Sequence, residues 1–147
     1  MRKRTHAREY ALQILYQLEM NPIPVEEMMG SFWEENEETA KDVRRFTEML
    51  VRGSLERREE IDATILKATE NWQLDRMAVI DRSILRFATY ELLYVEDIPR
   101  KVTINEAVNL AKKFSQEESG KFVNGVLDKI NHSEKSRTAT GHEKPLA

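Results

Sequence analysis

The stretch IDRSILRFATYELLYVEDIPRKVTINEAVNLAKKFS, residues 80–115, decides the fold class of this chain. Its first half lies in a segment, Met77 to Val95, that is apolar around most of a helical wheel. Such a helix is usually buried in the middle of a bundle. Asp97 to Arg100 then form a predicted turn, and the apolar residues that follow recur at helical spacing. The stretch therefore predicts two helices of an all-α protein.

Helical periodicity extends over the rest of the chain. The sequence predicts helices over Thr5 to Asn21, from Val25, from about Thr39 with that threonine as N-cap, and over Ser119 to His132. Gly53 marks either close packing or a bend. Only five glycines and four prolines occur in 147 residues, which disfavours a turn-rich β architecture. We therefore expect one all-helical domain.

This domain is expected to have two halves. The periodicity breaks at Asn71 to Asp75, so we place the division between subdomains of about residues 1–70 and 75–132 there. Residues 1–8 form a basic N-terminal arm, and residues 133–147 are expected to be a flexible tail because the apolar pattern ends.

The composition argues against several classes of function. The chain has no cysteine, which excludes disulfides, thiolate metal sites and thiol catalysis. Its histidines, His6, His132 and His142, lie at the two ends without ligand-like spacing, so we expect no metal or cofactor. No apolar run approaches the roughly 20 residues that span a bilayer, and no secretory signal follows the basic start. A soluble cytoplasmic protein is expected.

The start of the chain is cationic, although the chain as a whole has a net charge of −3. Arg2, Lys3, Arg4 and Arg8 precede the first acidic residue, Glu9. A concentrated cationic end can attract a polyanion while the rest of the molecule repels it, which suggests a nucleic-acid adaptor. The alternative interpretation is an ordinary solvated, disordered terminus.

Four further residues do not fit a plain helical bundle. Leu12 and Tyr16 fall opposite the apolar stripe of the first helix, so either they face a partner or the fold covers that helix on both sides. Asp81 and Glu91 fall in the apolar sector of the central helix, where an unpaired carboxylate is costly. Asp81 either caps that helix or meets a partner at the edge of the bundle, while Glu91 accepts hydrogen bonds from the turn that ends at Thr103.

Two helix starts carry recognisable patterns. Thr103 and Glu106 have the spacing of a capping box. At the expected start of the last helix, Gly120 and Lys121 suggest an anion site, and Phe122 either stacks on an unpaired base or packs in the core. No nucleophile, metal-ligand set or glycine-rich phosphate loop accompanies the carboxylates, so catalysis is not expected.

Three stretches together resemble the bacterial NusB family of transcription antitermination factors. They are RKRTHAREYALQILYQLE at residues 2–19, the stretch at residues 80–115, and SGKFVNGVLDKI at residues 119–130. The last two are specific because they fix polar residues such as Asn105 and Asn124 within an apolar pattern. The resemblance covers Arg2 to about Asn131.

The resemblance implies two small helical bundles packed across each other and a function without catalysis. It implies an adaptor that pairs with NusE, a small-subunit ribosomal protein, and binds boxA RNA of nascent ribosomal transcripts, helping RNA polymerase to resist termination. The residues implied to contact RNA are Arg2, Lys3, Arg4, Arg8, Lys121 and Phe122. Those implied to form or support the partner surface are Leu12, Tyr16, Asp81, Arg82 and Arg86.

This chain departs from the family pattern at Thr5 and His6, where relatives often carry further arginines. Fewer fixed charges should weaken the sequence-independent part of RNA affinity, so reliance on the protein partner should be greater. A related domain precedes some ribosomal RNA cytosine methyltransferases, but no catalytic cysteine is present for methyl transfer. The remaining alternative is a self-associating helical protein, for example a homodimer, that uses the Tyr16 face.

Overall fold

The computed structural model describes residues 2–70 and 74–139, with side chains as far as Ser133. Its elements are α1 (Lys3–Met20), α2 (Val25–Glu35), α3 (Lys41–Glu56), α4 (Arg58–Ala68), the 3-10 helix η1 (Leu74–Arg76), α5 (Val79–Tyr94), α6 (Arg100–Phe114) and α7 (Glu117–Ala139). Within these ranges every regular element is a helix, which confirms the predicted all-α class.

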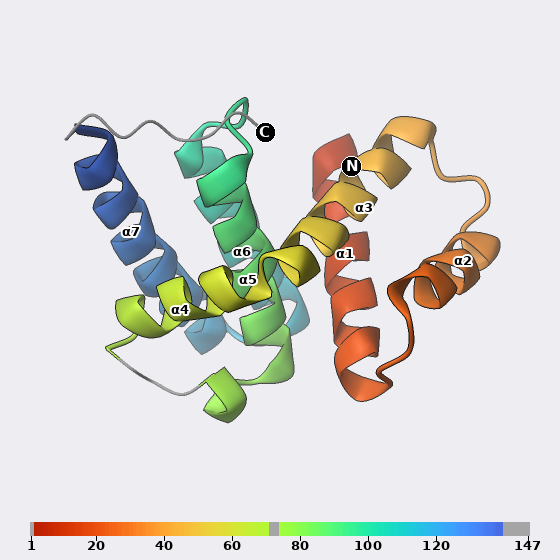
Figure 1. The fold of residues 1–147 in the computed structure, drawn as a ribbon, viewed down its shortest axis with the longest axis horizontal. Helices are drawn as coiled ribbons and strands as arrows, with labels where there is room; N and C mark the ends of the chain where they lie inside the picture. The colour runs from red at the N-terminus through yellow and green to blue at the C-terminus, as the bar shows by residue number, and fades with distance from the viewer. Residues whose placement is uncertain (1, 71–73, 140–147) are drawn as a thin grey trace.

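Helix α5 is the centre of the packing. It contacts α1, α3, α4, α6 and α7, while α2 packs on α1 at the far end of the molecule (Figure 1). Ile84, Leu85, Phe87 and Leu92 of α5 are completely buried. The prediction that this nearly all-apolar helix lies inside the bundle is therefore confirmed.

Helices α3 and α4 form a bent rod that crosses α5 (Figure 1). The bend is at Arg57, the single residue between the two helices. Just before it, Gly53 lies against the Tyr90 ring, so close that a Cβ atom on this glycine would come within 2.2 Å of the ring. The close-packing alternative for Gly53 is confirmed, whereas the break between the helices lies four residues later, at Arg57.

The bent rod links the two groups of helices. Because α4 packs on α5 and α7, it belongs spatially with the second group, and α1, α2 and α3 form the first. The packing therefore changes at Arg57, whereas the periodicity of the sequence breaks later, at Asn71 to Asp75. Residues 71–73 of that break lie outside the described residues.

Two helix boundaries differ from expectation. Thr39 does not cap α3, because Ala40 is the N-cap residue and the Thr39 hydroxyl donates to the Asn36 carbonyl at 2.8 Å. Helix α7 continues past His132 to Ala139, and the rest of the expected tail, residues 140–147, lies outside the described residues. In the described part of the chain, none of the helices has the length and apolar character needed to cross a membrane.

Candidate nucleic-acid and partner interface

Arg8 lies inside the molecule, where α1 meets α5 and α6. Its guanidinium donates to both carboxylate oxygens of Glu91, with Nε–Oε2 at 2.7 Å and Nη2–Oε1 at 2.8 Å. Nη1 also donates to Glu106 Oε1 at 3.1 Å. Arg8 is 2% exposed and Glu91 is fully buried. The structure thus corrects the prediction that Arg8 belongs to an exposed arm, because its charge is already paired within the fold.

The polar groups around this ion pair form one network. The Thr103 hydroxyl donates to Glu91 at 2.9 Å, as expected from the sequence, although Thr103 lies in the first turn of α6 and not in a turn before it. Glu106 also accepts a hydrogen bond from the Thr5 hydroxyl. The capping-box prediction is therefore wrong: α6 begins at Arg100, and Thr103 and Glu106 instead fasten α6 to α5 and α1.

This network fixes the charge of Arg8. Burial lowers the pKa of the guanidinium, but the hydrogen bonds and negative charges of Glu91 and Glu106 outweigh burial and raise it. Arg8 is therefore permanently cationic, and the pair is held by a bidentate geometry that favours charged partners. The start of α1 cannot move without breaking it.

Arg2, Lys3 and Arg4 are exposed at the start of α1. Lys3 Nζ pairs with Asp42 at 2.9 Å, and an Arg4 Nη2 pairs with Asp97 at 3.2 Å. Exposed pairs of this kind are worth only about 0–1 kcal/mol, so a phosphate can compete for these cations. Lys3 and Arg4 belong to the first turn of α1 and Arg2 is its N-cap residue, and the assignment of these three cations to RNA stays a prediction.

Thr5 and His6, the positions that depart from the family pattern, both contact other residues of the fold. The Thr5 hydroxyl is held by Glu106, and the His6 ring lies on Tyr10 with 4.2 Å between ring centroids. Both residues are half-buried. Among the cations predicted for the basic arm, the exposed ones are therefore those at residues 2–4.

The start of α7 differs from the predicted anion site. The helix begins at Glu117, and the Gly120 amide already donates to the Gln116 carbonyl at 3.3 Å. Glu117 and Glu118 occupy the first turn, which opposes a second anion there. Lys121 is exposed, and Phe122 is partly buried against the core, consistent with the core alternative for this ring.

The face of α1 that carries Leu12 and Tyr16 is only partly covered. Leu12 is 4% exposed and belongs to the core, which agrees with the alternative that the fold covers this side of the helix. Tyr16 is 39% exposed, one turn further along α1. The fold therefore covers this side of α1 at Leu12, whereas Tyr16 is exposed and could face a partner.

Asp81 is buried in the first turn of α5. The helix begins at Val79 after Ala78, so Asp81 is not the N-cap. Its Oδ2 accepts a hydrogen bond from Ser119 at 3.1 Å, while Oδ1 is buried without a hydrogen-bond partner. Burial raises the pKa of this carboxyl, and the hydrogen bonds from Ser119 and Ser115 only partly oppose it.

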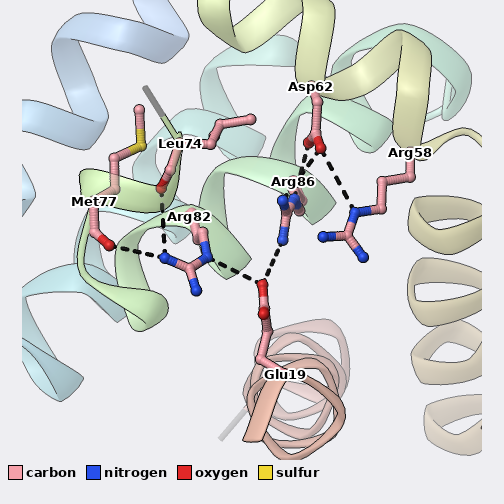
Figure 2. Close-up of polar contacts among 7 residues, drawn as sticks. All are labelled: Glu19, Arg58, Asp62, Leu74, Met77, Arg82 and Arg86. Carbon is pink, nitrogen blue, oxygen red and sulfur yellow. Dashed lines mark hydrogen bonds and ion pairs between the residues drawn. The ribbon is translucent and has the colours of Figure 1, made fainter. Parts of the chain in front are cut away.

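Arg82 and Arg86 tie α1 and α4 to α5 (Figure 2). Both guanidinium groups donate to the same oxygen, Glu19 Oε1, at 3.0 Å from Arg82 and 2.7 Å from Arg86. Arg86 also donates to both carboxylate oxygens of Asp62, at 2.9 and 3.2 Å, and Arg82 donates to the carbonyl of Met77 at 3.0 Å. These arginines therefore hold α1 and α4 on α5, and Arg86 is buried; their support of a partner surface stays a prediction.

Sequence reasoning missed three exposed apolar side chains, one of which is Val102 of α6 at 39% exposed. Met20 at the end of α1 is 56% exposed, and Phe114 at the end of α6 is 37% exposed. The neighbouring Lys113 pairs with Glu9 of α1 at 3.0 Å, which brings the end of α6 alongside α1. Phe114 follows the apolar periodicity of its helix, which predicts burial. Its place as the last residue of α6 is the one feature that could have indicated exposure. No group of residues that could hold a metal ion occurs among those described.

Comparison with known proteins gives the family. The model of the NusB family matches residues 5–132. The transcription antitermination protein NusB of Thermodesulfovibrio yellowstonii is 46% identical over 141 residues, covering 90% of this chain and 93% of the relative. That of Exiguobacterium sp. is 52% identical over 128 residues, covering 87% and 96%. This chain belongs to the NusB family. Its members are antitermination proteins rather than enzymes, as the sequence predicts.

Solved NusB structures share the fold. In a crystal structure of the antitermination factors NusB and NusE in complex with dsRNA, the matching chain has a TM-score of 0.82 at 32% identity, covering 90% of this chain and 98% of that chain. NusB of T. maritima has a TM-score of 0.81 at 37% identity, covering 91% and 96%. The expected NusB-like arrangement of helices is confirmed.

We expect Arg8→Met to lower the free energy of unfolding by about 3–5 kcal/mol at pH 7, because Glu91 would remain buried without the guanidinium. The matched control Arg4→Met removes an exposed cation and should change it by less than about 1 kcal/mol. Urea denaturation followed by circular dichroism measures both. Equally small losses would contradict a structural role for Arg8.

Asp81→Asn is expected to raise the free energy of unfolding at pH 7 by about 1 kcal/mol, because it removes a buried, incompletely bonded charge. The pKa of Asp81 is higher in the folded than in the unfolded chain, so ionisation destabilises the folded state. As the pH falls through the folded pKa, Asp81 becomes neutral and the advantage of asparagine should shrink. Denaturation curves between pH 7 and pH 4 test this, and a constant difference would contradict it.

Proposed function

We propose that this chain is an RNA-binding adaptor that pairs with the ribosomal protein NusE and binds boxA RNA on nascent transcripts, including ribosomal RNA. The observation that carries the proposal is its likeness to the NusB chain of the NusB–NusE–dsRNA complex, over 90% of its length. On this proposal the chain works in the cytoplasm as part of an antitermination complex with RNA polymerase, and it contributes binding rather than chemistry.

The RNA side is assigned to Arg2, Lys3 and Arg4, with Lys121 and Phe122 of α7 as further contacts. The first three are exposed, and the exposed pairs of Lys3 and Arg4 are exchangeable for phosphates. Arg8 has a different part: by locking the start of α1 onto α5 and α6, it holds the exposed cations in place. Phe122 would need to leave its contact with the core before it could stack on a base.

The partner side is assigned to Tyr16 and its surroundings. Leu12 supports this face from beneath, and the Glu19 contacts of Arg82 and Arg86 hold α1 on α5 next to it. Asp81 remains assigned to the partner side by the family resemblance, and its Oδ1 is the one carboxylate oxygen without a hydrogen-bond partner. A partner bound here would extend the RNA-binding surface, so that two weak contacts act as one stronger contact.

Self-association through the Tyr16 face is the competing function, and the exposed Met20 on the same helix is compatible with it. An RNA gel shift with and without NusE, together with sizing of the free chain, separates the two. Because relatives often carry further arginines at the positions of Thr5 and His6, RNA affinity should rise clearly when NusE is present. Equal affinity of the isolated and the paired chain would contradict that dependence.

Arg4→Ala is expected to weaken binding of boxA RNA and to make its salt dependence shallower by about 0.7, the slope of one phosphate contact on a single strand. Arg58→Ala, which removes an equally exposed cation from α4, is the control and should leave the slope unchanged. Fluorescence anisotropy over a range of salt concentrations measures both. An unchanged slope for Arg4→Ala would remove this residue from the interface.

Tyr16→Asp is expected to abolish pairing with NusE while the circular dichroism spectrum and melting temperature stay close to those of the native chain. A charge placed on an apolar interface residue must be desolvated when the partner binds. Val102→Asp is a matched control, because Val102 is also 39% exposed but lies on α6. Isothermal titration calorimetry gives the affinities, and retained pairing by Tyr16→Asp would refute the assignment.

A further inference from the structure

A groove of about 400 Å³ lies between the start of α1 and the first half of α3. Its lining residues are Lys3, Arg4, Asp42, Val43, Arg45, Phe46 and Met49. The apolar members recur on one face of α3, where Val43 is buried and Phe46 and Met49 are half-buried. The remaining lining residues are charged and exposed, so the groove has an apolar floor and a charged rim.

The rim is cationic. Lys3, Arg4 and Arg45 face a single carboxylate, Asp42, which Lys3 already neutralises at 2.9 Å. This is a local excess of positive charge on a chain whose net charge is −3. Arg45 has no ion pair or side-chain hydrogen bond with any described residue, so its charge is available. The charge therefore favours an anionic occupant.

The floor presents an aromatic ring that a planar group can cover. The Arg4 guanidinium lies 4.8 Å from the Phe46 ring centroid, and the buried Arg8 guanidinium lies 5.5 Å from it. Arg8 is fixed by Glu91 and Glu106, but Arg4 is exposed and has an exposed ion pair with Asp97. Arg4 can therefore leave the ring at little cost and move to a phosphate, which opens the ring to a base.

We propose that this groove binds one unpaired nucleotide of RNA, whose base stacks on Phe46 and whose phosphates contact Arg45 and Arg4. The proposal rests on the RNA-binding function proposed above and extends it from α1 to α3. A groove of this volume falls within the range of roughly 300–1,000 Å³ that is typical of small-ligand sites. An apolar ring beside cations provides both parts of single-strand recognition, stacking and phosphate neutralisation.

Two variants and one control test the groove in the chain paired with NusE. Arg45→Ala should weaken binding of single-stranded boxA RNA and make the salt dependence shallower by about 0.7. Arg44→Ala is the control, because this neighbouring guanidinium lies over Trp33 at 4.9 Å, outside the groove lining, and its loss should leave the slope unchanged. Phe46→Leu keeps an apolar side chain but removes the ring, and should weaken single-strand binding at least about fivefold.

A fully base-paired RNA distinguishes stacking from a general loss of structure. Phe46→Leu should bind the duplex as tightly as the native chain, and its melting curve should remain cooperative. If 4-thiouridine is placed in the single strand, photocrosslinks should map to the α3 peptide that contains Phe46. Crosslinks confined to α1 and α7, with native affinity for both variants, would overturn the groove while leaving the RNA-binding function intact.

Two other outcomes would also overturn the proposal. If the native chain binds no RNA with or without NusE, the proposed function fails, and the nucleotide site fails with it. If Arg45→Ala and Phe46→Leu weaken binding of NusE but leave the affinity for RNA unchanged, the groove is a protein-docking site.

Discussion

The buried ion pair between Arg8 and Glu91 is the constraint on which the arrangement of the first helix depends. Two charges buried together are stable only when geometry and further hydrogen bonds compensate for the lost hydration, and here both are present. The guanidinium donates two hydrogen bonds to Glu91 and a third to Glu106. The Thr103 hydroxyl donates a further hydrogen bond to Glu91. One arginine thus joins α1 to both α5 and α6. Because the exposed cations at residues 2–4 lie at the start of the same helix, this ion pair also fixes their backbone position.

The second point of attachment is at the opposite end of α1. Glu19 accepts from Arg82 and Arg86 of α5, and Arg86 in turn holds Asp62 of α4. Between the two attachments, the helix packs Ala11, Ile14 and Leu15 into the core and leaves Tyr16 partly exposed. Polar contacts thus set the orientation of α1, while apolar burial provides most of its stability.

The sequence predicted much of this arrangement, for reasons that can be traced to particular residues. The periodicity of apolar residues predicted the central helix. The expected hydrogen bond to Glu91 from the segment Ile98 to Thr103 is present, because Thr103 at its end donates to Glu91. The main partner of Glu91 was not predictable, because Arg8 is 83 positions away and its charge resembled those of its exposed neighbours. The capping-box prediction for Thr103 and Glu106 failed because their partners are also distant in the sequence. Both side chains form hydrogen bonds with residues of other helices. The sequence left open whether Leu12 and Tyr16 are covered, because a helical wheel shows one helix without its neighbours.

Helix α1 carries the arm residues at one end and Tyr16 near the other, with no glycine or proline among its 18 residues. At 1.5 Å per residue, it sets the separation of Arg4 and Tyr16 at about 18 Å. On the proposed function, this helix fixes the distance between the RNA-binding residues and the residue proposed to face the protein partner. One added residue in its middle would turn the two ends by about 100° relative to each other, so the length of this helix is under tighter constraint than its surface composition.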